Sequence, residues 1–320
     1  MTGEQGVPEL SIVSTLYRSE GTLREFYGRM VVSAEELGAS FEIVFVNDGS
    51  PDRSVELVRE LMSEDPRIVL VDLSRNFGHH QAAVAGLTHA RGRRIFIIDV
   101  DLEERPEWLP DFVAEHDRTQ ADVVYGVSRV RKGTLARRLF GSVFWKLFNA
   151  LSETPVPANP CTVRLMSRRY VDALLRLPDK NLFLAGNYAW VGFHQVGHAV
   201  EKGLRPTAST YTASRLMALF LDAVTSFTSY PLRLIFLSGV SIALVSVLAG
   251  SALLAWKIAA PQSISLGWPS IMVSLWFLGG IIIAFIGIIG IYLSKIFNEA
   301  KDRPLFLVKE IRRHAGSSEP

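Results

Sequence analysis

Residues 41–50 read FEIVFVNDGS, an apolar run that stops at four polar or small residues. Branched and aromatic side chains favour strands, whereas Asn, Asp and Gly favour turns. Similar apolar runs occur at Leu10–Leu16, Ile68–Leu73, Ile95–Ile98 and Val123–Val127, with helical patterns between them. This alternation predicts an α/β fold, with a mostly parallel sheet flanked by helices.

Two helix starts can be predicted within this pattern. Thr22-Leu23-Arg24-Glu25 can form a capping box, in which the first and last side chains each bond the other's backbone amide. Ser50-Pro51 predicts a second start, with serine as the N-cap and proline at the first helical position. We therefore expect helices to begin at Leu23 and Pro51.

Polar residues follow four of the predicted strands. They are Tyr17-Arg18-Ser19-Glu20, Asn47-Asp48-Gly49-Ser50, Ser74-Arg75-Asn76-Phe77-Gly78 and Asp99-Val100-Asp101. Ligands of open parallel sheets bind beyond the carboxyl ends of the strands, so these residues form the predicted site. None of these segments reads Gly-x-Gly-x-x-Gly, so the sequence lacks the phosphate loop of a dinucleotide-binding protein.

Asp99 and Asp101 flank one residue at the end of a predicted strand. Alternation along a strand would aim both carboxylates to one side. Paired carboxylates can hold Mg²⁺ or Mn²⁺, which fills its other positions with water and substrate phosphate. The alternative is a solvated acidic turn.

Asp48 and several basic residues also have two interpretations each. Asp48 is either a turn residue before the second helix or a ligand of a nucleotide base. Guanidinium groups suit the recognition of phosphate, but an arginine is also common on a solvated surface. The basic residues that could bind phosphate are Arg129, Arg131, Lys132, Arg164 and Arg205.

Composition excludes several classes of protein. The 34 Lys and Arg residues nearly balance 32 Asp and Glu residues, for a net charge of +2, so nucleic-acid binding is not indicated. Cys161 is the only cysteine, which excludes a disulfide framework and a Cys-rich zinc site. His79 and His80 are adjacent, and His194 and His198 would share a face only on a helix, so the histidines predict no metal site.

Leu234–Trp256 and Ser270–Ser294 are each long enough to cross about 30 Å of hydrocarbon as a helix. Between Leu234 and Ser294, Lys257 is the only Asp, Glu, Lys, Arg or His. Two buried core helices are the alternative, but segments this apolar would need a larger soluble core than the chain can build. We predict a two-helix transmembrane hairpin.

Charges near the spans predict their orientation. The connection 259–269 is uncharged, whereas basic residues precede the first span and follow the second, at Arg233, Lys295, Lys301, Arg303, Lys309, Arg312 and Arg313. The positive-inside rule then places both termini in the cytoplasm. The first nine residues also lack the basic start and apolar core of a signal peptide.

These features predict four parts in a protein of the inner membrane. They are a cytoplasmic domain at 1–212, a juxtamembrane amphipathic helix at 213–231, the hairpin at 232–296 and a cytoplasmic tail at 297–320. Residues 215–227 and 141–151 place apolar side chains at helical spacing opposite polar ones. Such a helix can lie on a membrane surface or face a protein core.

Five motifs occur in order: Val13-Ser14-Thr15-Leu16-Tyr17, Asn47-Asp48-Gly49-Ser50, Ser74-Arg75-Asn76-Phe77-Gly78-His79, Asp99-Val100-Asp101-Leu102-Glu103 and Arg164-Leu165-Met166-Ser167-Arg168. With the hairpin, they resemble the family 2 glycosyltransferases of GT-A fold. The resemblance is closer to their polyprenyl-phosphate branch, which includes dolichol-phosphate mannose synthases and bacterial transferases with two C-terminal spans. It covers nearly the whole chain.

The resemblance implies inverting transfer of a sugar from a nucleotide-diphosphate sugar to a polyprenyl phosphate. The absence of a signal peptide and the compact architecture favour a bacterial protein, for which undecaprenyl phosphate would be the default acceptor. The reaction would occur at the cytoplasmic membrane face and serve cell-envelope glycan synthesis or modification. The implied partners are the donor, the lipid acceptor and the membrane, without nucleic acid. A homo-oligomer is left open.

The resemblance also implies roles for single residues. Thr15, Tyr17 and Asp48 would border the nucleotide base, and Asp99 and Asp101 would face the Mg²⁺ or Mn²⁺ ion and the diphosphate. Arg129 and Arg131 match positions that hold the lipid phosphate. The segment that closes over donor and acceptor would include Arg164, Arg205, Ser209 and Tyr211. The catalytic candidates are Asp101, Arg164 and Arg205.

The chain departs from the family pattern at several positions. Thr15-Leu16-Tyr17-Arg18-Ser19 stands for Pro-x-Tyr-Asn-Glu, Thr162 stands where an acid is usual, and the other departures are Ala185, Lys202 and Thr210. A phosphate monoester with a second pKa of about 6 is already anionic near neutral pH and needs no strong general base. The absence of an acid at Thr162 therefore favours a lipid-phosphate acceptor.

Three alternatives remain open from the sequence. One is a family 2 transferase that acts on a hydroxyl group, which the short hairpin and Thr162 disfavour. Another is an inactive relative that serves as a membrane scaffold in glycan assembly, which the retention of Asp99 and Asp101 disfavours. A transporter formed by the hairpin is disfavoured because neither span contains the ionisable residues of a pathway.

Overall fold

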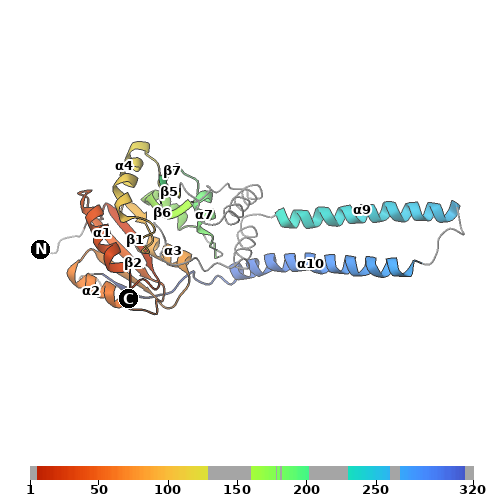
Figure 1. The fold of residues 1–320 in the computed structure, drawn as a ribbon, viewed down its shortest axis with the longest axis horizontal. Helices are drawn as coiled ribbons and strands as arrows, with labels where there is room; N and C mark the ends of the chain where they lie inside the picture. Colours follow the sequence, from red (N-terminus) through yellow and green to blue (C-terminus); the bar gives the residue numbers. More distant parts are fainter. Residues whose placement is uncertain are drawn as a thin grey trace. The chain divides into compact units, whose positions relative to one another are not determined.

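The computed structural model describes residues 6–128, 160–177, 179–180, 182–201, 230–259 and 267–313. The chain divides into two compact units. Unit 1 comprises Met1–Asn149, Thr154–Thr212 and Arg303–Pro320, and unit 2 comprises Ala150–Glu153 and Ala213–Asp302. The described part of unit 1 contains a sheet with its helices, and that of unit 2 contains two long helices (Figure 1).

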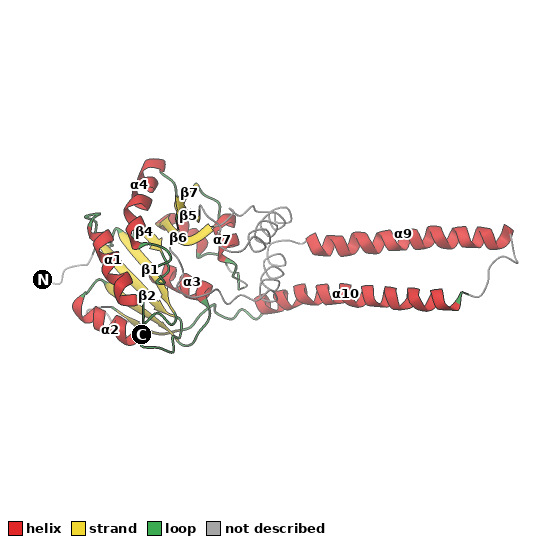
Figure 2. Cartoon of the chain, in the orientation of Figure 1, coloured by secondary structure: helices red, strands yellow, loops and turns green. Residues whose placement is uncertain are grey.

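A mixed sheet of eight strands forms from the described residues of unit 1 (Figure 2). Its order is β7-β5-β6-β4-β1-β2-β3-β8, and neighbouring strands are hydrogen-bonded. The strands are β1 (Leu10–Leu16), β2 (Phe41–Asn47), β3 (Ile68–Leu73), β4 (Arg94–Ile97), β5 (Val123–Ser128), β6 (Pro160–Ser167), β7 (Gln195–Val200) and β8 (Val308–Arg312).

Strand directions make the sheet mainly parallel. β4, β1, β2 and β3 lie side by side in parallel, and β7 is parallel to β5. β6 runs antiparallel to both β4 and β5, and β8 runs antiparallel to β3. The predicted α/β class with a mostly parallel sheet is confirmed, and the five predicted strands correspond to β1 to β5.

Helices cover both faces of the sheet (Figure 2). One buried cluster joins Phe26 and Phe112 to Ile12, and the other joins Tyr170 to Val13. Successive residues of a strand point to opposite faces, which explains why Ile12 and Val13 enter different clusters. The helices are α1 (Leu23–Glu35), α2 (Ser54–Glu64), α3 (His79–His89), the 3₁₀ helix η1 (Pro106–Trp108), α4 (Leu109–Thr119), α6 (Arg168–Leu174) and α7 (Leu184–Trp190).

One of the two predicted helix starts is confirmed, but both predicted side-chain caps need correction. α1 begins at Leu23 as expected, but the Thr22 side chain does not cap it and instead donates to the carbonyl of Ser19 at 3.4 Å. α2 begins only at Ser54, after Arg53 as N-cap. Ser50 is not a cap because its hydroxyl accepts from the amide of Arg18 at 2.7 Å and donates to Asp52 at 2.5 Å.

The last strand belongs to the same sheet as the first, although the long helices of unit 2 separate β8 from the other strands in sequence. The amide of Ser74, at the end of β3, donates to the carbonyl of Leu307 at 2.9 Å. Lys309 pairs with the buried Asp72 at 3.4 Å, and Arg313 pairs with the buried Glu42 at 3.3 Å. Residues 297–320, expected as a tail, therefore contribute an edge strand to the domain.

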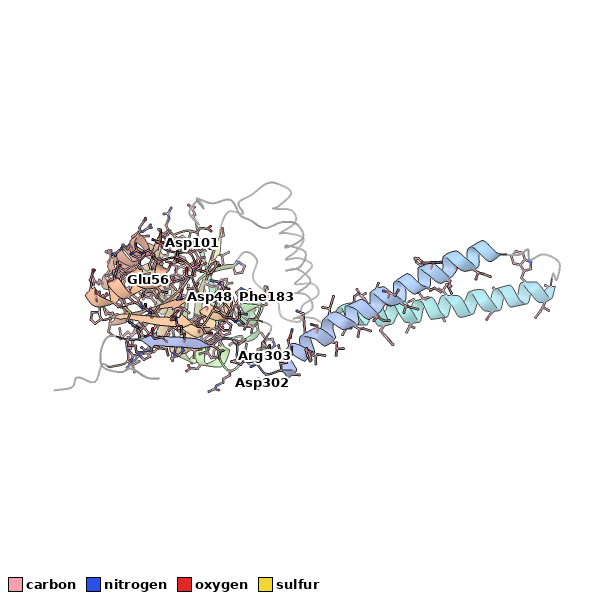
Figure 3. The ribbon with its side chains drawn as sticks, turned by 90° about the horizontal axis from the view of Figure 1, so that it is seen from below. Asp48, Glu56, Asp101, Phe183, Asp302 and Arg303 are labelled. Atoms are coloured by element: carbon pink, nitrogen blue, oxygen red, sulfur yellow. The ribbon has the colours of Figure 1, made fainter. Side chains whose placement is uncertain are left out.

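Unit 2 contains α9 (Tyr230–Ala259) and α10 (Trp268–Ala300), which lie side by side and run in opposite directions (Figure 1). α9 covers the first predicted span and α10 the second. Within the described residues, one segment, Ser274–Ala300, is long and apolar enough to cross a membrane. Figure 3 labels Asp302 and Arg303, where the chain passes from unit 2 back into unit 1.

Candidate functional site

The candidate site lies at the edge of the sheet where the parallel strands β1 to β4 end. The amide of Asp48 bonds the carbonyl of Leu16 at 3.0 Å, which ties the ends of β1 and β2 together. The Ser14 hydroxyl donates to the carbonyl of Ile98 at 2.8 Å, which ties β1 to the chain that leads to Asp99. The sheet therefore brings together the loops that carry Tyr17, Asp48 and Asp99.

Asp48 is a buried acceptor for the loop between β3 and α3. Its Oδ1 accepts from the amide of Phe77 at 2.7 Å and its Oδ2 from the amide of Gly78 at 3.0 Å, and the residue is only 3% exposed. Burial raises the pKa of Asp48 above its ordinary value, although these amides, His79 and Arg75 act to lower it. Asp48 therefore joins the turn after β2 to the loop after β3. Neither interpretation of the sequence included this role.

Gly49 permits the close approach of these two loops. Its φ of 60° lies in the left-handed region, which favours glycine. A Cβ atom at this position would lie 2.5 Å from the backbone nitrogen of Asn76. Any larger residue would therefore push the turn after β2 away from the loop after β3.

Asn47 holds the same turn from inside the sheet. Its side-chain oxygen accepts from the amide of Ser50 at 3.0 Å, and its side-chain nitrogen donates to Asp72 at 2.7 Å. Both Asn47 and Asp72 are buried. The polar residues at the end of β2 are consequently fixed in place before any ligand binds.

The loop after β1 is fixed by hydroxyl and carboxylate groups. Ser19 accepts from the amide of Tyr17 at 3.1 Å, and Asp52 accepts from the amide of Glu20 at 3.0 Å and from the hydroxyl of Ser54 at 2.6 Å. The Tyr17 ring remains exposed at 48%. This loop presents an aromatic face at the edge of the sheet, beside the guanidinium of Arg18 at 5.6 Å from the ring centre.

Asp99 and Asp101 lie beyond β4, which ends at Ile97. The strand alternation that predicted a common direction for the two carboxylates therefore does not apply to them. Asp101 Oδ1 accepts from the amide of Glu103 at 3.0 Å, so the carboxylate is fixed within a turn. Figure 3 labels Asp48 and Asp101, both in unit 1.

His79 lies among the acidic groups of this edge. Its Nδ1 is 3.1 Å from the hydroxyl of Thr15, and its Nε2 is 3.7 Å from Asp99 Oδ1. Partial burial lowers the pKa of His79 below its ordinary value, although the carboxylates of Glu104, Asp48 and Asp101 act to raise it. Four carboxylates thus act on one imidazole, which shows that negative charge is concentrated here.

This charge suits a hard divalent cation, although the described residues include no group of three or more His, Cys, Asp and Glu side chains placed to hold a metal ion. Mg²⁺ and Mn²⁺ commonly take one or two carboxylates and complete their shell with water and substrate phosphate. Asp99 and Asp101 fit that requirement by their chemistry.

Arg164 is buried in β6, opposite Ile97 of β4. It donates to the carbonyls of Cys161 at 3.0 Å and Thr162 at 3.2 Å, and its guanidinium stacks 3.6 Å from the ring centre of Tyr188. Burial raises the pKa of Tyr188. The charge of Asp99 also acts to raise this pKa, whereas that of Arg164 acts to lower it. Arg164 therefore places a positive charge behind the acidic edge.

Glu104 is a second buried ionisable residue, which the sequence patterns did not reveal. It is 0% exposed, and its Oε1 accepts from the amide of Thr162 at 3.0 Å. A carboxylate thus reaches the backbone of Thr162, the position where the family pattern places an acid. The sequence shows two adjacent acidic residues, Glu103 and Glu104, but it does not indicate which of them is buried or where its side chain points.

Six residues that the sequence analysis nominated lie outside the described residues, namely Arg129, Arg131, Lys132, Arg205, Ser209 and Tyr211. The predicted amphipathic segments 141–151 and 215–227 also lie outside them. The structure brings Thr15, Tyr17, Asp48, Asp99 and Asp101 to one edge of the sheet, with Arg164 buried in the neighbouring strand.

The structure shows an α/β domain with acidic residues at the carboxyl ends of its parallel strands. Residues 11–175 match the family model described as glycosyl transferase family 2, and the chain belongs to this family. The family predicted from the five motifs is confirmed.

Relatives match along nearly the whole chain. A Mycobacterium tuberculosis protein whose name places it with the glycosyltransferases is 40% identical to this chain over 302 residues. The match covers 94% of this chain and 88% of the relative. A prophage-derived bactoprenol glucosyl transferase of Shigella flexneri is 33% identical over 95% of this chain and 99% of its own length. The mannosyltransferase PcManGT from Pyrobaculum calidifontis, solved with GDP-Man and Mn²⁺, aligns with a TM-score of 0.47 at 17% identity, over 93% of this chain and 87% of that chain.

Proposed function

We propose that the protein transfers a sugar from a nucleotide-diphosphate donor to a polyprenyl phosphate at the cytoplasmic face of a membrane. The observation that carries this proposal is the extent of the likeness to the Shigella flexneri bactoprenol glucosyl transferase. It spans 95% of this chain and so includes the helices of unit 2 as well as the acidic edge. Undecaprenyl phosphate is the proposed acceptor, and cell-envelope glycan the destination of the sugar.

The donor would bind across the ends of β1, β2 and β4. Tyr17 offers an exposed ring on which a nucleotide base can stack. Thr15 and Asp48 would border the base, but Asp48 is 3% exposed and would act chiefly by fixing the loop that carries Phe77 and Gly78.

Asp99 and Asp101 would hold a Mg²⁺ or Mn²⁺ ion, which would offset the charge of the departing nucleotide diphosphate. The Glu103 amide donates a hydrogen bond of 3.0 Å to Asp101 Oδ1, which keeps the carboxylate in one orientation. Arg164 would balance part of the acidic charge from its buried position in β6, rather than contact the donor.

The acceptor phosphate would attack the anomeric carbon directly, and the configuration at that carbon would invert. A phosphate monoester is already anionic near neutral pH, so the step needs no strong general base. Catalysis would rest on positioning and on stabilisation of charge. Arg129 and Arg131 are the proposed ligands of the lipid phosphate, with Arg205, Ser209 and Tyr211 in the segment that closes over both substrates.

The position of β8 supports a membrane hairpin with both ends on one side. The chain leaves unit 1, forms α9 and α10, and returns to the same sheet at β8. A chain that starts and ends in one domain crosses a membrane an even number of times. If the apolar segment Ser274–Ala300 crosses once, a second crossing is required, and the 30 residues of α9 are long enough to provide it.

Transfer of radiolabelled sugar into organic-extractable lipid tests the proposal. The full chain in detergent is incubated with undecaprenyl phosphate, Mn²⁺ and a panel of UDP, GDP and dTDP sugars. Asp101→Ala is compared with Asp111→Ala, which removes an exposed carboxylate from α4. We expect label in the lipid phase with one donor, a loss of at least about 100-fold in Asp101→Ala, and little change in Asp111→Ala.

Other results would favour the alternatives. Label in a hydroxyl acceptor but not in lipid phosphate would indicate a different family 2 reaction. A folded protein that binds no donor and labels no lipid would indicate the scaffold. Equal activity of Asp101→Ala and wild type would remove Asp101 from the site.

A further inference from the structure

His79 occupies a position that the structure fixes closely. It is the first residue of α3 and follows Gly78, whose φ of 111° turns the chain into the helix. Asp48 accepts from the amides of Phe77 and Gly78, so a buried carboxylate from another loop holds the backbone just before His79. The placement of this imidazole therefore depends on the buried Asp48.

The two ring nitrogens of His79 face different parts of the site. Nδ1 lies 3.1 Å from the hydroxyl of Thr15, within hydrogen-bond distance, and Nε2 lies 3.7 Å from Asp99 Oδ1. A carboxylate only accepts hydrogen bonds, so it favours the tautomer with the proton on Nε2. Nδ1 then accepts from the Thr15 hydroxyl, and Nε2–H points toward the acidic group.

This arrangement leaves a hydrogen-bond donor available at the acidic edge. The His79 side chain is 45% exposed, and its Nε2 is too far from Asp99 for a direct hydrogen bond. The other groups that act on the imidazole are the carboxylates of Glu104, Asp48 and Asp101. A diphosphate bound here would meet mainly negative side chains, so a fixed N–H donor would stabilise it by a hydrogen bond to one of its oxygens.

We propose that His79 is a donor-binding residue, which presents Nε2–H to an oxygen of the nucleotide diphosphate beside Asp99 while Thr15 fixes the ring. This inference rests on the proposed function and adds a contact to its donor site. It also assigns a role to the Thr15 hydroxyl, which lies 3.1 Å from His79 Nδ1. This contact would orient the imidazole toward Asp99.

His80 provides a matched control in the adjacent position. Its Nδ1 lies 3.2 Å from the carbonyl of Leu182, so this ring contacts the segment before α7. Substitution of His80 tests the general effect of losing an imidazole from the first turn of α3. The His79 ring has a nitrogen 3.7 Å from Asp99, whereas the His80 ring contacts the carbonyl of Leu182 instead.

The test measures binding of UDP, GDP and dTDP by calorimetry in the presence of Mn²⁺, together with KM for the donor sugar and for undecaprenyl phosphate. His79→Ala, His79→Asn, His79→Gln and His80→Ala are compared with the full-length wild type. Gln can place its amide nitrogen near the position of Nε2, whereas Asn reaches only the position of Nδ1. Thermal unfolding checks that each variant is folded.

We expect His79→Ala to weaken nucleotide binding and to raise KM for the donor by about 10–100-fold, the effect of losing a hydrogen bond to a charged group. KM for the lipid phosphate should stay within about twofold, and His79→Gln should recover more affinity than His79→Asn. His80→Ala should bind the nucleotide like the wild type.

Two results would overturn the inference while leaving the proposed function intact. Wild-type protein that labels lipid while His79→Ala retains full nucleotide affinity would remove His79 from the donor site. Equal losses in folded His79→Ala and His80→Ala would show an effect of the helix rather than of the ring. A wild type that binds none of the nucleotides would instead reject the proposed function itself.

Discussion

The side-chain amide of Asn47 donates a hydrogen bond of 2.7 Å to the carboxylate of Asp72 in the neighbouring strand. Both side chains are buried, and Lys309 of β8 lies 3.4 Å from the second carboxylate oxygen. Asn47 also accepts from the amide of Ser50. The strand that follows the long helices is thereby connected through Asp72 to the turn that carries Asp48.

We expect Asp72→Ala to lower the free energy of unfolding by about 1–3 kcal/mol, because it leaves the buried Asn47 amide without its acceptor. Lys309→Ala removes an exposed partner and should cost less than about 1 kcal/mol. Thermal unfolding of the full chain in detergent measures both. Equal melting temperatures for Asp72→Ala and wild type would contradict the role assigned to this bond.

Asp48→Ala should be more damaging than Asp48→Asn. Alanine removes the acceptor for two amides, those of Phe77 and Gly78, at a cost of about 1–3 kcal/mol, whereas asparagine retains one oxygen. Both variants should bind nucleotide more weakly, since the loop before His79 loosens. Melting temperature and calorimetric affinity report the two effects separately, and a stability order of Ala above Asn would refute the explanation.

Gly86 allows α3 to pack tightly on the sheet. A Cβ atom there would lie 2.3 Å from Val13 Cγ1 and 3.0 Å from Val46 Cγ2. Gly86→Ala should therefore destabilise the protein by about 1–3 kcal/mol through overpacking, despite a helix propensity that favours alanine by about 1 kcal/mol. Gly28→Ala in α1 is the control, since nothing lies within 4 Å of its added Cβ and a gain of up to about 1 kcal/mol is expected.

Asp52 should make stability depend on pH in the acid range. Burial acts to raise its pKa, but bonds from Ser50, Ser54 and the amide of Glu20 outweigh burial and lower the pKa from 3.8 to about 2. Because the folded pKa is depressed, the stabilisation is present above pH 3.8 and is lost as the pH falls toward 2. It amounts to at most about 2.5 kcal/mol, at about 1.4 kcal/mol per pKa unit.

Asp52→Asn tests this dependence. We expect the variant to melt below the wild type near neutral pH, and the difference between them to shrink as the pH falls from 3.8 toward about 2. Melting temperatures across a pH series provide the measurement. A difference that stays constant over that range would mean that the ionised carboxylate is not what stabilises the loop.

The return of the chain to β8 predicts the sidedness of the membrane hairpin. Single cysteines at Ser263, in the connection between the spans, and at Ser318, near the C-terminus, can be labelled with a membrane-impermeant maleimide. We expect them to react from opposite sides, with Ser318→Cys labelled only after the cytoplasmic face is opened. Cys161 is buried and gives little background. Labelling of both positions from one side would exclude a two-span hairpin.

Sequence patterns located β1 to β5 but missed both edge strands, β7 and β8, and the interior strand β6. β1 to β5 were predictable because each contains a run of apolar residues, and polar residues follow the first four of these strands. β8 reads Val-Lys-Glu-Ile-Arg, a short segment with three charges, and its pairing with β3 depends on Leu307 reaching Ser74 across the chain. β6 and β7 contain Arg164 and His198 within their runs, which hid their strand character.

The candidate site was predictable as a set of residues but not as a network. Thr15, Tyr17, Asp48, Asp99 and Asp101 follow or end strands, and parallel strands place such ends at one edge. The direction of each side chain could not be predicted from these patterns. His79 has no metal-ligand spacing to its neighbouring histidine, and its contacts with Thr15 and Asp99 arise only when α3 packs against the sheet.

Local patterns in the sequence indicate strands β1 to β5, the polar edge and two long apolar segments, because periodicity and turn propensity act over a few neighbouring residues. The partner of each polar group depends instead on packing between distant segments. Thr22 and Ser50 both suit helix caps, yet their hydroxyls bond Ser19 and Asp52. Asp48 suits a turn, yet its carboxylate bonds the amides of a loop 29 and 30 residues away, because buried acceptors take the donors that packing brings nearest.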